Sequence, residues 1–87
     1  MNNLSDGYAV FVKRDCATCV LVSPVLAEIR AAGLPLTIYT QDDPTFPDGM
    51  DDITNDLTLE AAYHNDIETV PTLLRIEGGK EQGRAVG

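Results

Sequence analysis

Cys16-Ala17-Thr18-Cys19 is the stretch that decides the fold, because it holds both cysteines and joins an apolar run to a helical pattern. A two-residue spacing lets the cysteines close a disulfide, and it equally lets two thiolates bind one metal ion. At the first turn of a helix, unpaired N–H groups and the positive end of the helix dipole stabilise the thiolate of Cys16. The residues alone therefore leave redox chemistry and metal binding open.

The segments flanking this stretch predict a strand, a helix and a second strand. Residues 8–12 are nearly all apolar, which is typical of a strand buried on both faces. After Cys19, apolar residues recur at helical spacing as Val22, Val25, Leu26 and Ile29. Gly33 is placed to end this helix, and Pro24 is expected to kink it. Residues 34–40 predict the second strand, so the three elements form a βαβ unit with parallel strands.

Residues 41–56 predict a long acidic loop. They contain six aspartates, two prolines and one glycine, without a period that would bury any face. A calcium site is the alternative, but residues 48–52 lack the alternating ligands and the terminal glutamate of an EF-hand loop. We therefore interpret the stretch as a solvated loop.

A short second helix is predicted over residues 57–64, with Asp56 or Thr58 as its N-cap. Its expected inner face consists of Leu59, Ala62 and Tyr63. His64, the only histidine, falls at the C-terminal end, where a cationic ring suits the helix dipole. A proton shuttle and a metal ligand are the alternative roles for this ring.

The C-terminal part of the chain predicts a β-hairpin. Val70-Pro71-Thr72 leads into a strand at residues 73–76, and Gly78-Gly79 forms the turn. Residues 80–86 return as the partner strand. Pro71 is tolerated at the start of a strand, and a bond before proline can be cis at small cost.

The totals predict one small globular domain over residues 1–87, with 44% hydrophobic content and a mobile lead at residues 1–7. A net charge of −8 disfavours nucleic acid and anionic membranes as partners. With neither a signal segment nor a membrane span in the sequence, we expect a soluble, cytoplasmic protein. In a reducing compartment, two cysteines this close are more often catalytic or metal-binding than structural.

Taken in order, these features resemble the thioredoxin-like family over residues 8–87. Cys19 followed five residues later by Pro24 is similar to the family's active-site helix, and Val70-Pro71-Thr72 is similar to its cis-proline segment. The resemblance implies an α/β fold with a central mixed four-stranded sheet, built as βαβ, then a helix, then a hairpin. The family's C-terminal helix is missing, so we expect a fragment of a longer chain or a domain without that helix. Either case implies self-association or a fused C-terminal segment over the open sheet face.

The resemblance also implies the roles of the site residues. Cys16 is expected to attack a disulfide and Cys19 to resolve the mixed disulfide, without cofactor or metal. Val70, Pro71 and Thr72 are expected to bind substrate, with a cis bond before Pro71. Between the cysteines, Ala17 and Thr18 are candidates for tuning the thiolate, Thr18 through a hydrogen bond.

The expected function is that of a thiol-disulfide oxidoreductase in electron transport, with a redox-active centre at Cys16 and Cys19. Its partners would be a disulfide-containing protein or a small thiol, and a reductase or thiol donor. One alternative is a thioredoxin-like docking or redox-sensing module with little turnover. The other is a metal carrier similar to the heavy-metal-associated domain. That domain is expected to have a βαββαβ order with a Met or Thr just ahead of the first cysteine, and it leaves Pro24 and Val70-Pro71-Thr72 unexplained.

Overall fold

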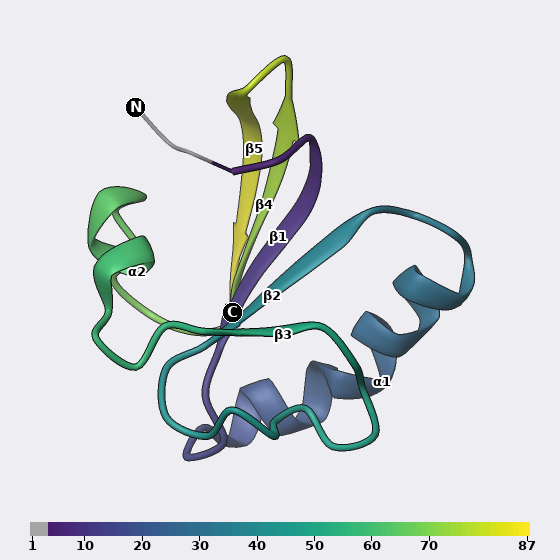
Figure 1. The fold of residues 1–87 in the computed structure, drawn as a ribbon, viewed down its shortest axis with the longest axis vertical. Helices are drawn as coiled ribbons and strands as arrows, with labels where there is room; N and C mark the ends of the chain where they lie inside the picture. Colours follow the sequence, from purple (N-terminus) through teal and green to yellow (C-terminus); the bar gives the residue numbers. More distant parts are fainter. Residues whose placement is uncertain (1–3) are drawn as a thin grey trace.

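Five strands in the order β3-β2-β1-β4-β5 form one mixed sheet, with two helices packed against it (Figure 1). The structure is a computed structural model and describes residues 4–87. Within that range the elements are β1 Gly7–Val12, α1 Ala17–Ala31, β2 Leu36–Thr40, β3 Ile53–Asn55, α2 Glu60–His64, β4 Thr72–Glu77 and β5 Lys80–Val86. The chain is thus an α/β domain, with one strand more than the four expected.

Strand β1 occupies the centre of the sheet, with β2 parallel on one side and β4 antiparallel on the other. Val10 lies opposite Ile38 of β2 and Leu73 of β4. A central strand is buried on both faces, which explains why this run is apolar without alternation. Because the cysteine loop follows directly, the C-terminal end of β1 positions the candidate site.

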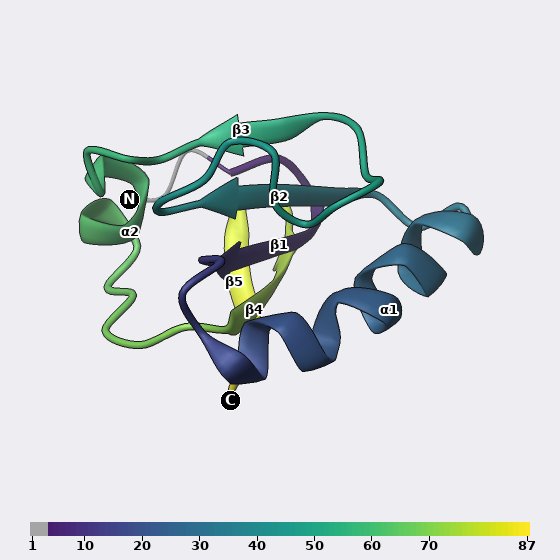
Figure 2. The same ribbon diagram turned by 90° about the horizontal axis from the view of Figure 1, so that it is seen from below.

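Two apolar clusters cover the two faces of the sheet, because successive side chains of β1 point in opposite directions. Ala9 packs with Ala62 of α2, whereas Val10 packs with Leu26 of α1. Both views of the ribbon show the two helices on different sides of the strands (Figure 2). Cys19 belongs to the cluster on the α1 side.

Helix α1 begins at Ala17, directly after Cys16, and contains Pro24 as expected. It ends at Ala31, and Gly33 follows with φ +81° while donating its N–H to the carbonyl of Arg30. A positive φ of this kind is the usual end of a helix at glycine. Among residues 4–87, α1 included, no helix is long and apolar enough to span a membrane.

Strand β3 corrects the expectation that residues 41–56 form a loop throughout. It pairs in parallel with β2, with Ile53 opposite Ile38 and Asn55 opposite Thr40. Ile53 also packs against the apolar cluster on the α1 side. A three-residue edge strand needs only this one apolar contact, so it leaves no alternation to be recognised in the sequence. The prediction of a four-stranded sheet was wrong for this reason.

Helix α2 is shorter than predicted, since it begins at Glu60 instead of residue 57. The carboxylate of Asp56 accepts hydrogen bonds from the N–H groups of Ala61 at 2.9 Å and Ala62 at 3.0 Å. Ala62 is buried, but Leu59 and Tyr63 are 46% and 80% exposed. A five-residue helix makes little more than one turn, so it turns only one side chain fully toward the sheet. The predicted inward positions of Leu59 and Tyr63 are therefore wrong.

Residues 4–7 do not form the lead expected at the N-terminus. Leu4 is buried in the cluster on the α2 side. The carboxylate of Asp6 accepts the N–H groups of Gly78 at 3.2 Å and Gly79 at 3.0 Å, in the β4–β5 turn. Gly7 already belongs to β1. The remaining part of the predicted lead, residues 1–3, lies outside the described residues.

An apolar groove of about 210 Å³ lies between α1 and the β4–β5 hairpin. Its lining consists of Val10, Val22, Val25, Leu26, Ile29, Pro71, Leu73, Ala85, Val86 and Gly87. Within it, Val25 is 50% exposed. This part of the α1 face therefore keeps apolar side chains open to solvent.

Candidate functional site

The two cysteines form a disulfide at the N-terminus of α1, with their Cα atoms 5.2 Å apart. Cys16 is the N-cap residue, with extended backbone, and its Sγ accepts the N–H of Cys19 at 3.1 Å. In the reduced protein this N–H and the helix dipole favour negative charge on Cys16. The N-cap position therefore suits a reactive thiolate.

Burial separates the two sulfurs. Cys19 has no exposed surface and packs inside the α1-side cluster, whereas Cys16 is half-buried at the edge of that cluster. A disulfide of another molecule can therefore approach Cys16 first. Attack on Cys19 from solvent would require the N-terminus of α1 to open.

The segment before β4 lies directly beside Cys16. The Sγ atom of Cys16 is 3.6 Å from the carbonyl oxygen of Val70, and the Val70-Pro71 bond is cis. Thr72, in contrast, is buried and donates its hydroxyl to the carbonyl of Thr69 at 2.7 Å. The structure thus brings Val70 to the sulfurs, while the Thr72 side chain is used within the fold.

Ala17 and Thr18 lie on the exposed side of the first helical turn. In the described part of the chain, the hydrogen bond to Cys16 Sγ comes from the backbone of Cys19 and not from the Thr18 hydroxyl. The two residues between the cysteines therefore act mainly through the turn that they form.

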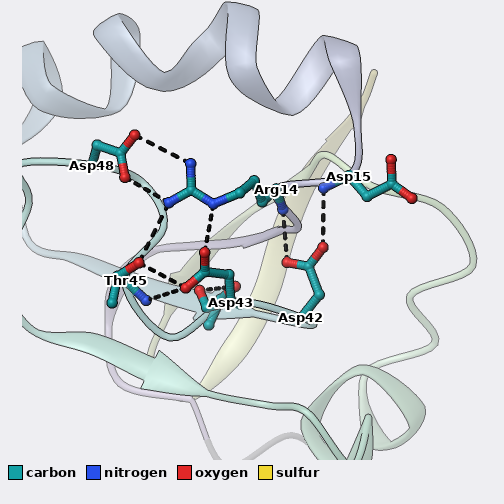
Figure 3. Close-up of polar contacts among 7 residues, drawn as sticks. Arg14, Asp15, Asp42, Asp43, Thr45 and Asp48 are labelled. Atoms are coloured by element: carbon teal, nitrogen blue, oxygen red, sulfur yellow. Dashed lines mark hydrogen bonds and ion pairs between the residues drawn. The ribbon is translucent and has the colours of Figure 1, made fainter.

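The acidic loop is tied to the cysteine loop by Arg14 (Figure 3). The guanidinium donates to Asp43 at 2.5 Å and to Asp48 at 2.6 Å, and it lies 5.1 Å from the ring centroid of Phe46. The Asp42 carboxylate accepts the N–H groups of Arg14 at 2.7 Å and of Asp15 at 3.0 Å. Together these contacts hold the backbone that leads into Cys16.

Sequence reasoning missed this contact network, since it treated the aspartates as a solvated loop. Hydrogen bonds from the side chain and backbone of Thr45, and then from Arg14, lower the pKa of Asp43 to about 2. The hydrogen bond from Arg14 lowers the pKa of Asp48 as well. The available signal was one arginine two residues before Cys16 and several aspartates after the second strand, since both segments follow the C-terminal ends of adjacent parallel strands.

A groove of about 650 Å³ opens beside Cys16. Besides Cys16 and Val70, its lining comprises Lys13, Asp15, Gln41, Leu59, Ala62, Tyr63, Ile67, Glu68 and Thr69. The groove therefore runs from the sulfur across to α2, and its lining combines apolar side chains with a few charged ones.

His64 is the last residue of α2, and its ring meets the ring of Tyr63 edge-on at 5.7 Å. It is not part of the lining of the groove beside Cys16. This position at the C-terminal end of the helix is the one that we expected. Among residues 4–87, no group of three or more His, Cys, Asp or Glu side chains is arranged to hold a metal ion.

Comparison of the chain with known protein families and with curated proteins finds no match.

Proposed function

We propose that this chain is a thiol-disulfide oxidoreductase of the thioredoxin-like type, in which Cys16 and Cys19 alternate between dithiol and disulfide. The observation that carries the proposal is the disulfide at the N-terminus of α1, with a half-buried first sulfur and a fully buried second one. This asymmetry suits an attacking thiolate followed by a resolving thiol.

In the proposed reaction, the Cys16 thiolate attacks one sulfur of a substrate disulfide. A bond forms between Cys16 and the substrate, the substrate S–S bond breaks, and the leaving thiolate takes a proton from water. The Cys19 thiolate then attacks Cys16 Sγ, which forms the intramolecular disulfide and releases the second substrate thiolate for protonation. Two electrons pass from the protein dithiol to the substrate, and a dithiol donor or a reductase returns them.

Val70 borders the reacting sulfur in this scheme, and Pro71 follows it after a cis bond. The Val70 carbonyl, 3.6 Å from Cys16 Sγ, is placed to accept a backbone N–H from a bound substrate segment. Substrates would be disulfide-containing proteins or small disulfides, and a reducing compartment such as the cytoplasm would keep the donor supplied.

The test is the reduction potential of the Cys16/Cys19 pair together with reduction of insulin by dithiothreitol. We expect a defined two-electron potential and an insulin reduction rate well above that of dithiothreitol alone. Cys16→Ser should return the rate to the background. A defined reduction potential without faster insulin reduction would support the docking or sensing alternative instead.

One observation favours the metal carrier as a second candidate. With β3 present, the first six elements follow the βαββαβ order that this alternative expects. Titration of the reduced protein with Zn²⁺ and Cu⁺ in the presence of a chromogenic chelator decides between the candidates. A carrier would bind one ion per chain tightly, whereas the oxidoreductase needs no such affinity.

A further inference from the structure

Two large apolar side chains of the α2 region, Leu59 and Tyr63, line the groove beside Cys16 and remain 46% and 80% exposed. Leu59 directly precedes α2, and Tyr63 lies within that helix. Both therefore face the space that a substrate of Cys16 would enter.

The backbone conformation of Leu59 is unusual for a leucine, which bears on why its exposed side chain is present. Leu59 has φ +63°, a left-handed conformation that L-residues with a branched side chain seldom adopt. Its N–H donates to the carbonyl of Asp56 at 2.8 Å, and its carbonyl accepts the N–H of Tyr63 at 2.9 Å. Glycine would adopt this conformation more easily and keep both bonds. Folding alone therefore gives no reason for leucine at this position.

Charge around the groove limits the kind of substrate. Among the described residues that line it, Lys13 is the one cation, and Asp15 and Glu68 are acidic. The chain as a whole carries a net charge of −8. Anionic disulfides are therefore repelled on approach, and neutral or basic ones are favoured.

We propose that this groove binds a polypeptide disulfide in which a bulky apolar residue flanks the attacked cysteine and the net charge is neutral or basic. Leu59 and Tyr63 are then the specificity-determining residues, since they hold the apolar side chain while the cysteine reaches Cys16. The inference rests on the proposed oxidoreductase function, and its chemistry is the two-electron exchange described above with dithiothreitol as the donor.

The experiment uses two cyclic peptides, each closed by one disulfide, that differ only in phenylalanine or serine next to a cysteine. The wild-type protein should reduce the phenylalanine peptide with a kcat/KM about 10-fold higher, a typical discrimination by one apolar contact. In Leu59→Gly and in Tyr63→Ser this ratio should fall toward one. Leu57→Gly is the matched control, because Leu57 is 45% exposed nearby but does not line the groove, and it should keep the wild-type ratio.

Denaturant unfolding of Leu59→Gly tests whether this variant is still folded, so that a changed ratio is not caused by unfolding. Since glycine accepts the left-handed conformation, we expect stability equal to or above that of the wild type. A second peptide pair carries either lysine or glutamate at a position distant from the disulfide. The protein should reduce the lysine peptide faster at low salt and lose that preference at high salt.

An unchanged phenylalanine preference in both groove variants would overturn the inference. So would a faster reaction with the glutamate peptide at low salt. If wild-type protein fails to reduce even the neutral bis(2-hydroxyethyl) disulfide, the proposed function itself is wrong, and this result differs from loss of selectivity alone.

Discussion

Cys16 and Cys19 are chemically identical side chains, and their surroundings make them different. The N–H of Cys19 lies 3.1 Å from the Cys16 sulfur, which stabilises a thiolate there, while Cys19 is enclosed by the α1-side cluster. A thiolate is the reactive form of cysteine, and access decides which sulfur meets a reagent.

We predict that, in the reduced protein, Cys16 is alkylated before Cys19. Limited treatment with iodoacetamide followed by peptide mapping measures the order. Denatured protein, in which both thiols are equally accessible, serves as the control. Faster labelling of Cys19 in the folded protein would reverse the assignment of roles.

Replacing the buried sulfur should stop the reaction halfway. In Cys19→Ser, Cys16 can still attack a disulfide, but nothing remains to break the resulting bond. We expect a mixed disulfide with the substrate to accumulate, visible as a mass increase that dithiothreitol removes. Undiminished turnover by this variant would rule out the two-cysteine mechanism.

At the scale of the elements, α2 depends on one buried acid. Asp56 bonds the N–H groups of Ala61 and Ala62 from outside the helix, because Leu59 offers no side-chain cap. Asp56→Ala should destabilise the protein by about 1–2 kcal/mol, the usual cost of losing such a cap. Equilibrium denaturation measures this, with Asp51→Ala at an exposed site as the control.

The loop that Arg14 holds should respond to acid. Hydrogen bonds from Thr45 and Arg14 lower the pKa of Asp43 from its ordinary value of 3.8 to about 2. Since the folded pKa is depressed, its stabilising effect is complete above about pH 4 and is lost as the pH falls toward 2. Arg14→Gln should weaken the pH dependence of the free energy of unfolding between about pH 4 and pH 2. The dependence that remains is the part due to the hydrogen bonds from Thr45.

Denaturant unfolding at several pH values between 5 and 2 measures this dependence. Arg75→Gln is the matched control, because Arg75 pairs with Glu77 on the exposed surface, far along the chain from the loop. Identical acid profiles for wild-type protein and Arg14→Gln would contradict the role of Arg14.

Prediction from sequence succeeded where an element is long or apolar and failed where it is short. Strand β1 and the regular spacing in α1 produce patterns that local residues alone specify. Strand β3 is held by its pairing with β2 and by the packing of Ile53, and the start of α2 is held by hydrogen bonds to the carboxylate of Asp56. The Arg14 network likewise joins residues about 30 positions apart, which no local pattern encodes.

On the scale of the whole molecule, the sheet is covered unevenly. Helix α1 packs over β1 and β2, whereas its side toward the β4–β5 hairpin borders the apolar groove of about 210 Å³. Apolar surface of this kind gains free energy when a second molecule removes it from water. The net charge of −8 opposes such contact between two copies, and salt screens that repulsion.

We therefore predict that the 87-residue chain self-associates through this groove, more strongly at high salt than at low salt. Sedimentation at several protein concentrations measures the association. Val25→Lys should weaken it, because Val25 lines the groove and is 50% exposed. Leu21→Lys is the matched control on the same helix, since Leu21 is 76% exposed but lies outside the groove lining. A monomer at every concentration and salt level, without binding of an apolar dye, would mean that α1 alone covers this face sufficiently.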